Sequence, residues 1–374
     1  MKPLPHQQKI IDQNPKKSLL NWEMRVGKTL PASVWIDMEC RSGNTYIICI
    51  KKNKKSWMNM NTKAKVLTKE EFKKIAHTIK NPTAIVIDEI HKFGSPLFVA
   101  GRSQLAEALY RVVKEYPTCD IMGLSATLVK QNAWSLHTIL CYIGVYYDWK
   151  EWRIEFFELK KLPFLRFPAW IPKKDWRVGI DKYLRKHTDI VSLSEVVENL
   201  PPAETRTLVV KNKKYTKPVD KIVTWVEEHR HEQGAKLKEI LEMGYRKLIL
   251  VCKYTEQIDY LEQELSKEKP VYILDGRTKH AEETIRQAQE AEDCYFIVQS
   301  SCGEGWDGWM FGAMVFVSMD HSVVSHTQMF GRQRHPKNIK ATETIYMIGG
   351  RWDKRILACI NEGENFNPHK YEPT

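Results

Sequence analysis

The sequence predicts an α/β protein with two parallel-sheet units in tandem. Short apolar runs alternate with longer amphipathic stretches, the pattern of parallel sheets covered by helices. This alternation occurs once before residue 141 and again after residue 240, and 374 residues are enough for two such units. The segment between them has a different composition, dense in aromatic and basic residues.

The first unit should contain four buried strands, which we predict at residues 18–22, 45–50, 83–87 and 120–124 from their apolar composition. Thr68 and Glu71 have the spacing of a capping box, which predicts that a helix begins there.

The intervening segment, residues 142–186, is interrupted by Pro163, Pro168 and Pro172. Because proline breaks regular structure, we expect no long helix or strand there. Pro201-Pro202 and the basic residues 211–217 predict a hinge after it.

The second unit should repeat the pattern. Its strands are predicted at residues 247–252, 271–274, 295–299, 313–318 and 343–348, and its helices near 255–266, 281–291, 325–333 and 352–361. We therefore predict a first domain over residues 1–141, an accessory segment and the start of the hinge over 142–205, and a second domain over 206–374.

Charge and composition narrow the possible partners. There are 58 Lys and Arg against 46 Asp and Glu, a net charge of +12, which favours a polyanion, nucleic acid before a membrane surface. No apolar run is long enough to span a membrane, and no secretory signal is visible. The eight cysteines lack paired spacing, so we expect reduced, mostly buried thiols in a cytoplasmic protein.

A phosphate-binding loop is predicted at Gly27-Lys28-Thr29, between the first strand and a helix. Backbone N–H groups at a helix N-terminus can cradle phosphates, Lys28 can reach the β- and γ-phosphates, and the Thr29 hydroxyl can hold Mg²⁺. Trp22 stands where the full motif has its first glycine, so the loop alone is weak evidence.

A carboxylate pair strengthens this prediction. Asp88 and Glu89 come directly after the buried strand 83–87, at its carboxyl end, beside the expected phosphate loop. There Asp88 can hold Mg²⁺ through water, while Glu89 orients and deprotonates the attacking water. The sequence therefore predicts a nucleotide with β- and γ-phosphates and Mg²⁺ as ligands, and hydrolysis of the γ-phosphate as the reaction.

In their order these motifs resemble the superfamily-two helicases and translocases, most of all the Swi/Snf-type group, in a compact, phage-like form. Residues 4–7 resemble the segment that reads adenine, which implies that Gln7 hydrogen-bonds the base. Residues 88–91 resemble a DEAH box, and Ser125-Ala126-Thr127 resembles the motif that couples the ATP and nucleic-acid sites. The resemblance implies coupling roles for His91, Ser125 and Thr127.

The first unit departs from the family at Arg25, which occupies a usual glycine position of the phosphate loop. The loop should therefore adopt a conformation that an L-residue allows or carry local strain. Its charge could point toward the nucleotide or toward solvent, and we expect solvent.

The second unit resembles the family at two further motifs. Residues 303–307 resemble a segment that touches the ribose, which implies nucleotide contacts for Gly305 and Asp307. Residues 328–334 resemble the arginine-finger motif, which implies that Gln328, Arg332 and Arg334 act at the γ-phosphate. The second arginine is one residue early, with His335 in its usual place, so Arg332 is the firmer finger.

The resemblance implies two tandem RecA-like lobes with parallel sheets, joined by an aromatic-basic connector. It also implies an ATP-dependent DNA helicase or translocase, acting in replication or recombination. The alternatives are an RNA helicase and an ATP-gated nucleic-acid clamp or loader that does not translocate. ATP turnover and strand displacement with different polynucleotides would separate them.

Nucleic-acid contacts are predicted at Lys51, Lys52, Lys54 and Lys55, which follow the strand 45–50. Lysines neutralise backbone phosphates without regard to sequence, although a solvated lysine loop is the alternative. In residues 142–186 we expect the aromatics to pack a subdomain and the basic rim to meet DNA.

DNA is favoured over RNA as the partner, and the predicted role would add replication or recombination proteins. We expect a monomer that does not contact membranes. We expect the protein in the cytoplasm, which is the cytoplasm of the bacterial host if the chain is phage-encoded.

Overall fold

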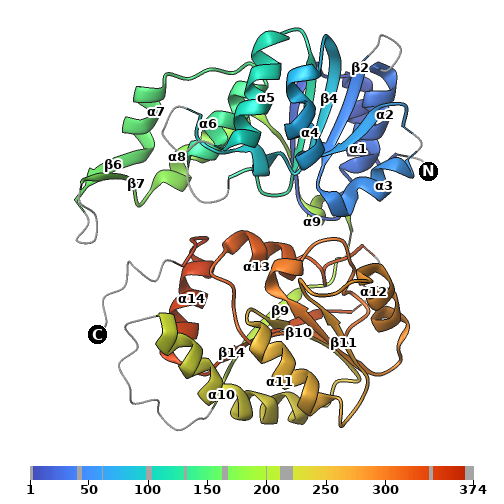
Figure 1. Cartoon of the computed structure of the whole chain (residues 1–374), viewed down its shortest axis with the longest axis vertical. Helices are drawn as coiled ribbons and strands as arrows, with labels where there is room; N and C mark the ends of the chain where they lie inside the picture. Colours follow the sequence, from blue (N-terminus) through green and yellow to red (C-terminus); the bar gives the residue numbers. More distant parts are fainter. Residues whose placement is uncertain are drawn as a thin grey trace. The chain divides into compact units, whose positions relative to one another are not determined.

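The computed structural model describes residues 3–39, 44–60, 62–97, 103–129, 133–161, 167–198, 200–210, 222–336 and 340–366. Two compact units, Met1–Val196 and Val197–Thr374, make up the chain (Figure 1). Each contains a six-stranded sheet whose strand pairs are all parallel. The predicted α/β class with two tandem parallel sheets is confirmed, and the three-part domain division stays a prediction.

The sheet of the first unit has the strand order β3-β2-β4-β5-β1-β8. Its strands are β1 (Lys17–Trp22), β2 (Asn44–Cys49), β3 (Lys65–Thr68), β4 (Pro82–Asp88), β5 (Asp120–Ser125) and β8 (Asp189–Val191). Its helices are α1 (Pro5–Gln13), α2 (Thr29–Glu39), α3 (Lys54–Met58), α4 (Lys69–Ile75), α5 (Gln104–Glu115) and α6 (Ala133–Tyr142). Helix α4 begins at the predicted capping box, in which Glu71 N donates to Thr68 Oγ1 (3.1 Å) and Thr68 N to Glu71 Oε2 (2.7 Å).

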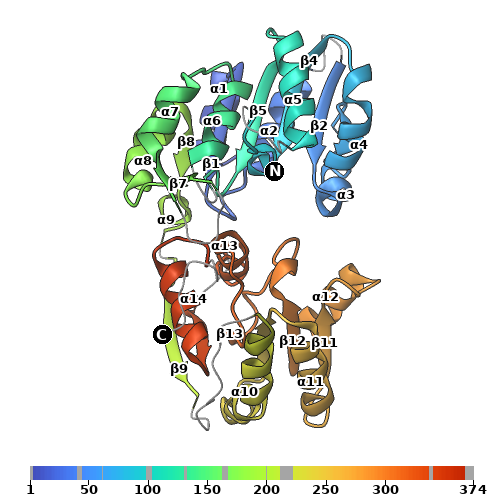
Figure 2. The same cartoon turned by 60° about the vertical axis from the view of Figure 1, so that its left-hand side comes forward.

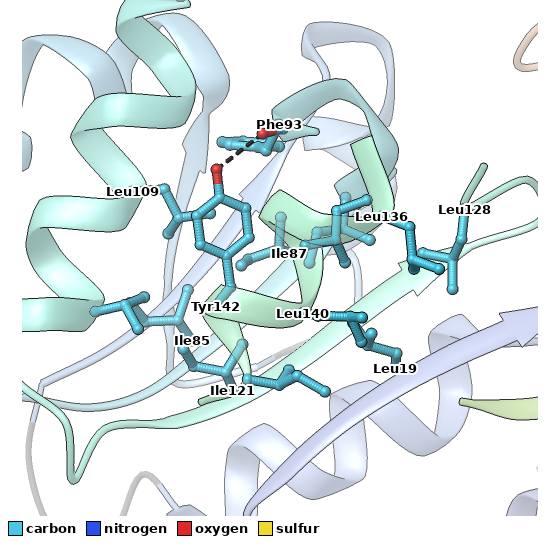
Figure 3. Close-up of a cluster of buried hydrophobic side chains, with 14 of the residues drawn as sticks. Leu19, Ile85, Ile87, Phe93, Leu109, Ile121, Leu128, Leu136, Leu140 and Tyr142 are labelled. Carbon is cyan, nitrogen blue, oxygen red and sulfur yellow. Dashed lines mark hydrogen bonds between the residues drawn. The ribbon is translucent and has the colours of Figure 1, made fainter. Parts of the chain in front are cut away.

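One large hydrophobic cluster holds this unit together (Figure 3). Ile85 and Ile87 of β4 pack in it with residues of α5 and α6. Tyr142 lies at its centre, and its hydroxyl donates to Phe93 O (2.8 Å), with Ala106 O as a second acceptor within reach of the same hydrogen (3.2 Å). This contact satisfies the buried hydroxyl and fixes α6 against its neighbours.

The accessory segment forms a small layer on the first unit. It contains α7 (Trp149–Phe156), the antiparallel strands β6 (Phe157–Lys160) and β7 (Ala169–Pro172), α8 (Trp176–His187) and α9 (Leu193–Val196). Helices α7 and α8 lie side by side (Figure 2). The expectation that this segment lacks long elements is wrong for α8, which runs for 12 residues because Pro172 precedes the helix and does not interrupt it.

The aromatic residues of this segment are divided between the core and the surface. Trp152, Phe156 and Trp176 are buried in the cluster of the first unit. Phe167, by contrast, is 69% exposed, and Tyr146 is 60% exposed. The buried aromatic residues of this segment therefore pack the accessory layer against the first unit.

The sheet of the second unit has the strand order β11-β12-β10-β13-β14-β9. Its strands are β9 (Ala203–Val209), β10 (Lys247–Cys252), β11 (Val271–Leu274), β12 (Cys294–Gln299), β13 (Ala313–Phe316) and β14 (Thr342–Ile348). Its helices are α10 (Ile222–Glu242), α11 (Thr255–Leu265), α12 (Ala281–Glu290), α13 (Val323–Phe330) and α14 (Arg351–Asn361). Ile249 and Val251 of β10 pack into one cluster with α14, whereas Leu248 and Leu250 pack into another with α11, so both faces of the sheet are covered.

Two predictions about the whole chain are tested here. The seven cysteines that the structure describes are free and buried, as expected; Cys40 lies outside the described residues, as do the hinge residues 211–217. Within the described ranges, every helix is too short or too polar to cross a membrane.

Candidate functional site

The candidate site lies where four neighbouring strands of the first unit end. In the sheet order, β2, β4, β5 and β1 are adjacent and parallel, so their carboxyl ends share one edge. The last residues of these strands and the segments that follow them carry the predicted phosphate loop, the lysines, the acid pair and Ser125. The fold therefore brings these separate motifs of the first unit to one edge of one sheet.

The phosphate loop follows β1 and leads into α2. Arg25 has a φ of 70° and Gly27 a φ of 85°, so the loop turns twice through left-handed backbone. A Cβ on Gly27 would lie 2.4 Å from Gln7 Nε2, a distance that only glycine avoids. Arg25 has a side chain and yet takes left-handed backbone, so its backbone is strained, which is the second of the two outcomes predicted.

Lys28 is held at this loop by two main-chain carbonyls. Its Nζ donates to Trp22 O (2.7 Å) and Glu23 O (3.2 Å). The ammonium is also near enough to Asp88 and Glu89 to favour the ionised form of both carboxylates. The loop lysine and the acid pair thus form one electrostatic group.

Helix α1 is fastened to the same loop. Gln7 Nε2 donates to Gly27 O (3.0 Å), and Gln7 Oε1 accepts from Leu4 N (2.8 Å). His6 Nε2 lies 3.0 Å from Val26 O. The amide of Gln7 therefore supports the loop in this structure, and its contact with adenine stays a prediction.

Asp88 is the last residue of β4, and two donors from the segment after β2 meet it. Asn53 Nδ2 donates to Asp88 Oδ2 (2.8 Å), as does Trp57 Nε1 (3.1 Å). Burial, and after it the charge of Glu89, raises the pKa of Asp88 above its usual value, and the two donors oppose this. Our sequence analysis missed both donors, although they lie among the lysines that it singled out.

Glu89 begins a hydrogen-bonded chain that reaches β5. His91 Nδ1 lies 3.1 Å from Glu89 Oε2 and 2.8 Å from Ser125 Oγ, and Ser125 Oγ accepts from Thr127 N (3.0 Å). The predicted coupling residues are therefore in contact with one another and with the acid. Burial alone would raise the pKa of Glu89, but the hydrogen bond and charge of His91, aided by Lys28, lower it.

Glu89 also has unusual backbone geometry, since its φ is 54°. Left-handed backbone is uncommon for a residue with a side chain and tends to be found at functional sites. The turn directs the chain from β4 into the short helix Ile90–Phe93, which carries His91.

The four lysines follow β2, in the helical turn Lys51–Asn53 and in α3. Lys51, Lys52 and Lys55 are exposed, whereas Lys54 Nζ contacts both carboxylate oxygens of Glu71 (2.8 Å). An anion must compete with Glu71 for Lys54. The three exposed lysines are therefore better candidates than Lys54 for binding phosphates.

The residues of this edge fit a magnesium nucleotide. Thr29 and Asp88 offer the oxygen ligands that Mg²⁺ prefers, and a metal bound mainly through phosphates and water needs few protein ligands. Gly27 and Lys28 supply the close backbone and the cation that phosphates require.

In the second unit, the two predicted motifs contact each other. Arg332 Nη1 donates to Trp306 O (3.1 Å), and Gly308 N donates to Arg332 O (3.0 Å). Gly305 has a φ of 85°, and Asp307 O accepts from Gln289 Nε2 (2.8 Å). Residues 303–307 and the segment after α13 are thus joined around Arg332.

The rest of the predicted finger motif flanks this arginine. Gln328 O accepts from Arg332 Nε (3.3 Å), and the partly buried Arg334 follows two residues later. His335 stacks on Trp309, with 5.6 Å between ring centroids. Gln333, which our sequence analysis did not single out, is 1% exposed and contacts Thr344.

The fold has counterparts among solved structures. S. cerevisiae Dbp5 bound to RNA and ADP BeF3 matches with a TM-score of 0.58 at 13% identity, over 97% of this chain and 88% of that one. A Dbp5 variant in the same bound state gives 0.57 at 14% identity, with the same coverage. The Sulfolobus solfataricus SWI2/SNF2 ATPase core in complex with dsDNA covers 97% and 91% at 11% identity, but its TM-score of 0.44 is too low to support an argument.

These matches show the fold alone: over 97% of its length, the chain shares the fold of the two Dbp5 structures. The Swi/Snf-type subgroup stays a prediction. No protein-family model matches the sequence, and neither does any curated protein.

Proposed function

We propose that this protein hydrolyses ATP with Mg²⁺ and uses the hydrolysis to move along or remodel DNA. The observation that carries the proposal is the connected set at the strand ends of the first unit. There Lys28 acts electrostatically on both acids, and Glu89 is joined through His91 to Ser125. The helicase-core fold supports it.

Each residue of the set has a chemical task. Bound Mg²⁺ would neutralise phosphate charge. Lys28 exchanges its two carbonyl partners for phosphate oxygens, and Thr29 and Asp88 offer oxygens to the metal. Glu89, kept ionised by His91 and Lys28, orients the attacking water and accepts its proton.

The second unit would supply positive charge to the reaction. We propose that Arg332, and after it Arg334, stabilises the charge that develops on the γ-phosphate, and that Gly305 and Asp307 contact the nucleotide. Gln328 belongs to the same motif. Hydrogen bonds to the main-chain carbonyls of Gln328 and Trp306 orient the guanidinium of Arg332.

DNA would bind in part through its phosphates. Lys51 and Lys52 are exposed beside the acid pair, and a cationic loop binds the sugar-phosphate backbone whatever its sequence. As the biological role of this activity we propose replication or recombination.

ATP turnover with different polynucleotides tests the proposal. Turnover should be compared without polynucleotide and with single-stranded DNA, duplex DNA, branched DNA and RNA, all at one salt concentration, because phosphate contacts depend on salt. We expect DNA to stimulate turnover and Lys28→Ala to abolish it. Turnover that no polynucleotide changes would refute the motor and favour a partner-driven switch.

An RNA helicase is the second candidate, because the fold matches Dbp5 bound to RNA with a TM-score above 0.5. Stimulation by RNA alone would establish it. An ATP-gated clamp would instead bind polynucleotide and hydrolyse ATP without displacing a strand from a duplex or from a triplex.

A further inference from the structure

The segment that follows β2 faces two ways. Residues 51–58 form a helical turn and then α3, without a break. Lys51 and Lys52 are exposed on this segment, whereas Trp57 is 2% exposed. The same eight residues thus present cations to solvent and send a buried indole toward the acid pair.

Two side chains of this segment, those of Asn53 and Trp57, contact the same atom of the acid pair. Asn53 Nδ2 (2.8 Å) and Trp57 Nε1 (3.1 Å) both donate to Oδ2 of Asp88, across 35 and 31 residues of sequence. Two donors on one carboxylate oxygen fix the plane of the group and direct its other oxygen, Oδ1, toward other ligands. Both bonds also favour the ionised carboxylate against burial.

A further contact anchors the segment from its other side. Lys54 pairs with Glu71, and Glu71 is itself held in the capping box at the start of α4. The segment is therefore fixed to α4 through Lys54 and to β4 through Asn53 and Trp57. A short element tied at three points moves as one body, so a shift at its lysines also moves the donors.

We propose that Asn53 and Trp57 are positioning residues, through which the backbone phosphates of nucleic acid at Lys51 and Lys52 control the orientation of Asp88. This inference rests on the proposed function and adds its regulation. It defines a route separate from the predicted coupling route through His91 and Ser125, since that route ends on Glu89. The ligand class is a polyanion with regularly spaced phosphates, read without regard to base.

Trp57→Phe tests the relay, because it removes the indole N–H and keeps an aromatic ring in the buried position. Trp35→Phe is the matched control: Trp35 is fully buried in the same unit, and its Nε1 donates to Pro15 O (3.0 Å), away from the acids. The main readout is the affinity for a fluorescein-labelled oligothymidylate, measured with and without a non-hydrolysable ATP analogue and Mg²⁺. A second readout is the Mg²⁺ concentration needed to bind a fluorescent ADP.

In the wild type, the nucleotide should change oligothymidylate affinity by about 5- to 150-fold, the usual range for coupled sites. Trp57→Phe should reduce that factor by about tenfold or to none, since bonds to charged groups are among the stronger ones, and should raise the Mg²⁺ requirement. Trp35→Phe should change neither. Equal coupling in Trp57→Phe, Trp35→Phe and the wild type would overturn the relay.

Asn53→Ala is the second test, with Asn59→Ala at the exposed end of α3 as its control. It should weaken coupling in the same direction and decides the matter if Trp57→Phe does not fold. The lysine side is tested by the double variant Lys51→Ala/Lys52→Ala, against Lys73→Ala/Lys74→Ala on the exposed side of α4. Only the first pair should lower the salt slope of binding, by about 1.4, because each phosphate contact to a single strand contributes about 0.7.

The outcomes separate the two proposals. A wild type whose ATP turnover ignores every polynucleotide refutes the proposed function and the relay with it. A wild type that is stimulated, with Trp57→Phe and Asn53→Ala coupled as strongly as their controls, overturns the relay alone.

Discussion

The two units use their backbones differently at the sites that we assign to nucleotide chemistry. In the first, Arg25 (φ 70°) and Glu89 (φ 54°) are left-handed, whereas Gly305 (φ 85°) takes that conformation in the second. Among the described residues, all the non-glycine residues with positive φ belong to the first unit. Strain is thus concentrated in the unit that carries the acid pair, which is where a prearranged site needs it.

The units also bury charge differently. In the second, Lys236 is fully buried between Asp353 (3.0 Å) and Glu232 (3.3 Å), and Lys236 Nζ also donates to Val317 O (2.8 Å). This cluster joins α10 to α14, because Lys236 and Glu232 lie on α10 and Asp353 lies on α14. In the first unit, two adjacent carboxylates share the influence of Lys28, an arrangement that favours binding a cation. Buried charge supports the structure in the second unit, whereas in the first unit we propose that it binds a ligand.

The largest expected effect comes from breaking the buried cluster of the second unit. Lys236→Met should lower the free energy of unfolding of that unit by about 3–5 kcal/mol, because two carboxylates stay buried without their cation. Urea unfolding followed by hydrogen exchange in β13 and β14 measures it.

Lys238→Met, at an exposed pair on the same helix, is the control and should cost about 0–1 kcal/mol. Equal losses in the two variants would show that the cluster is not structural.

A pH effect of intermediate size is expected at His326 in α13. Burial lowers the pKa of this ring to about 4, and its Nε2 lies 2.8 Å from the Tyr346 hydroxyl. The unfolded chain binds a proton near pH 6.5 that the native state does not, so stability is present above that pH and is lost as pH falls toward 4. Between pH 7.5 and 5 this amounts to about 2 kcal/mol.

His326→Gln should remove that part of the acid sensitivity in urea unfolding of the second unit, and the exposed His280→Gln should not. If the free energy of unfolding of His326→Gln depended on pH as strongly as that of the wild type, the ring would not titrate as expected.

The smallest effect sharpens the contrast in backbone strain. Relative to Arg25→Ala, Arg25→Gly should stabilise the first unit by about 1 kcal/mol, since only glycine takes a φ of 70° without strain. Gly305→Ala should destabilise the second unit by a similar amount, about 1 kcal/mol, because a Cβ there meets nothing within 4 Å and only the backbone resists. Thermal unfolding of the three variants measures both, and equal stability of Arg25→Gly and Arg25→Ala would refute the strain.

Most of the fold could be predicted because central parallel strands are continuous apolar runs. The nine predicted strands all occur, within two residues at each end. Five strands were missed: β3, β8 and β9 lie at the edges of the two large sheets, and β6 and β7 form the small two-stranded sheet. Most residues of β9 are exposed, so it has no apolar run to read, and its place is set by pairing with β14.

The candidate site could be predicted where one motif carries its own chemistry. Lys28, Asp88 and Glu89 are recognisable because phosphate loops and strand-end acids have characteristic residues. Asn53 and Trp57 are not, because their role depends on β2 and β4 being neighbours in the sheet. The pairing of Lys54 with Glu71 is hidden for the same reason, since only packing brings α3 to α4.

The most direct test of the central claim, that the first unit holds the hydrolytic site of a nucleic-acid motor, is Glu89→Gln. Polynucleotide-stimulated ATP turnover should fall by about 10²–10⁴-fold, because the amide cannot accept the proton of water. Binding of a labelled oligothymidylate should survive, and Glu70→Gln, at an exposed position on α4, should behave as the wild type. Full turnover in Glu89→Gln would contradict the account.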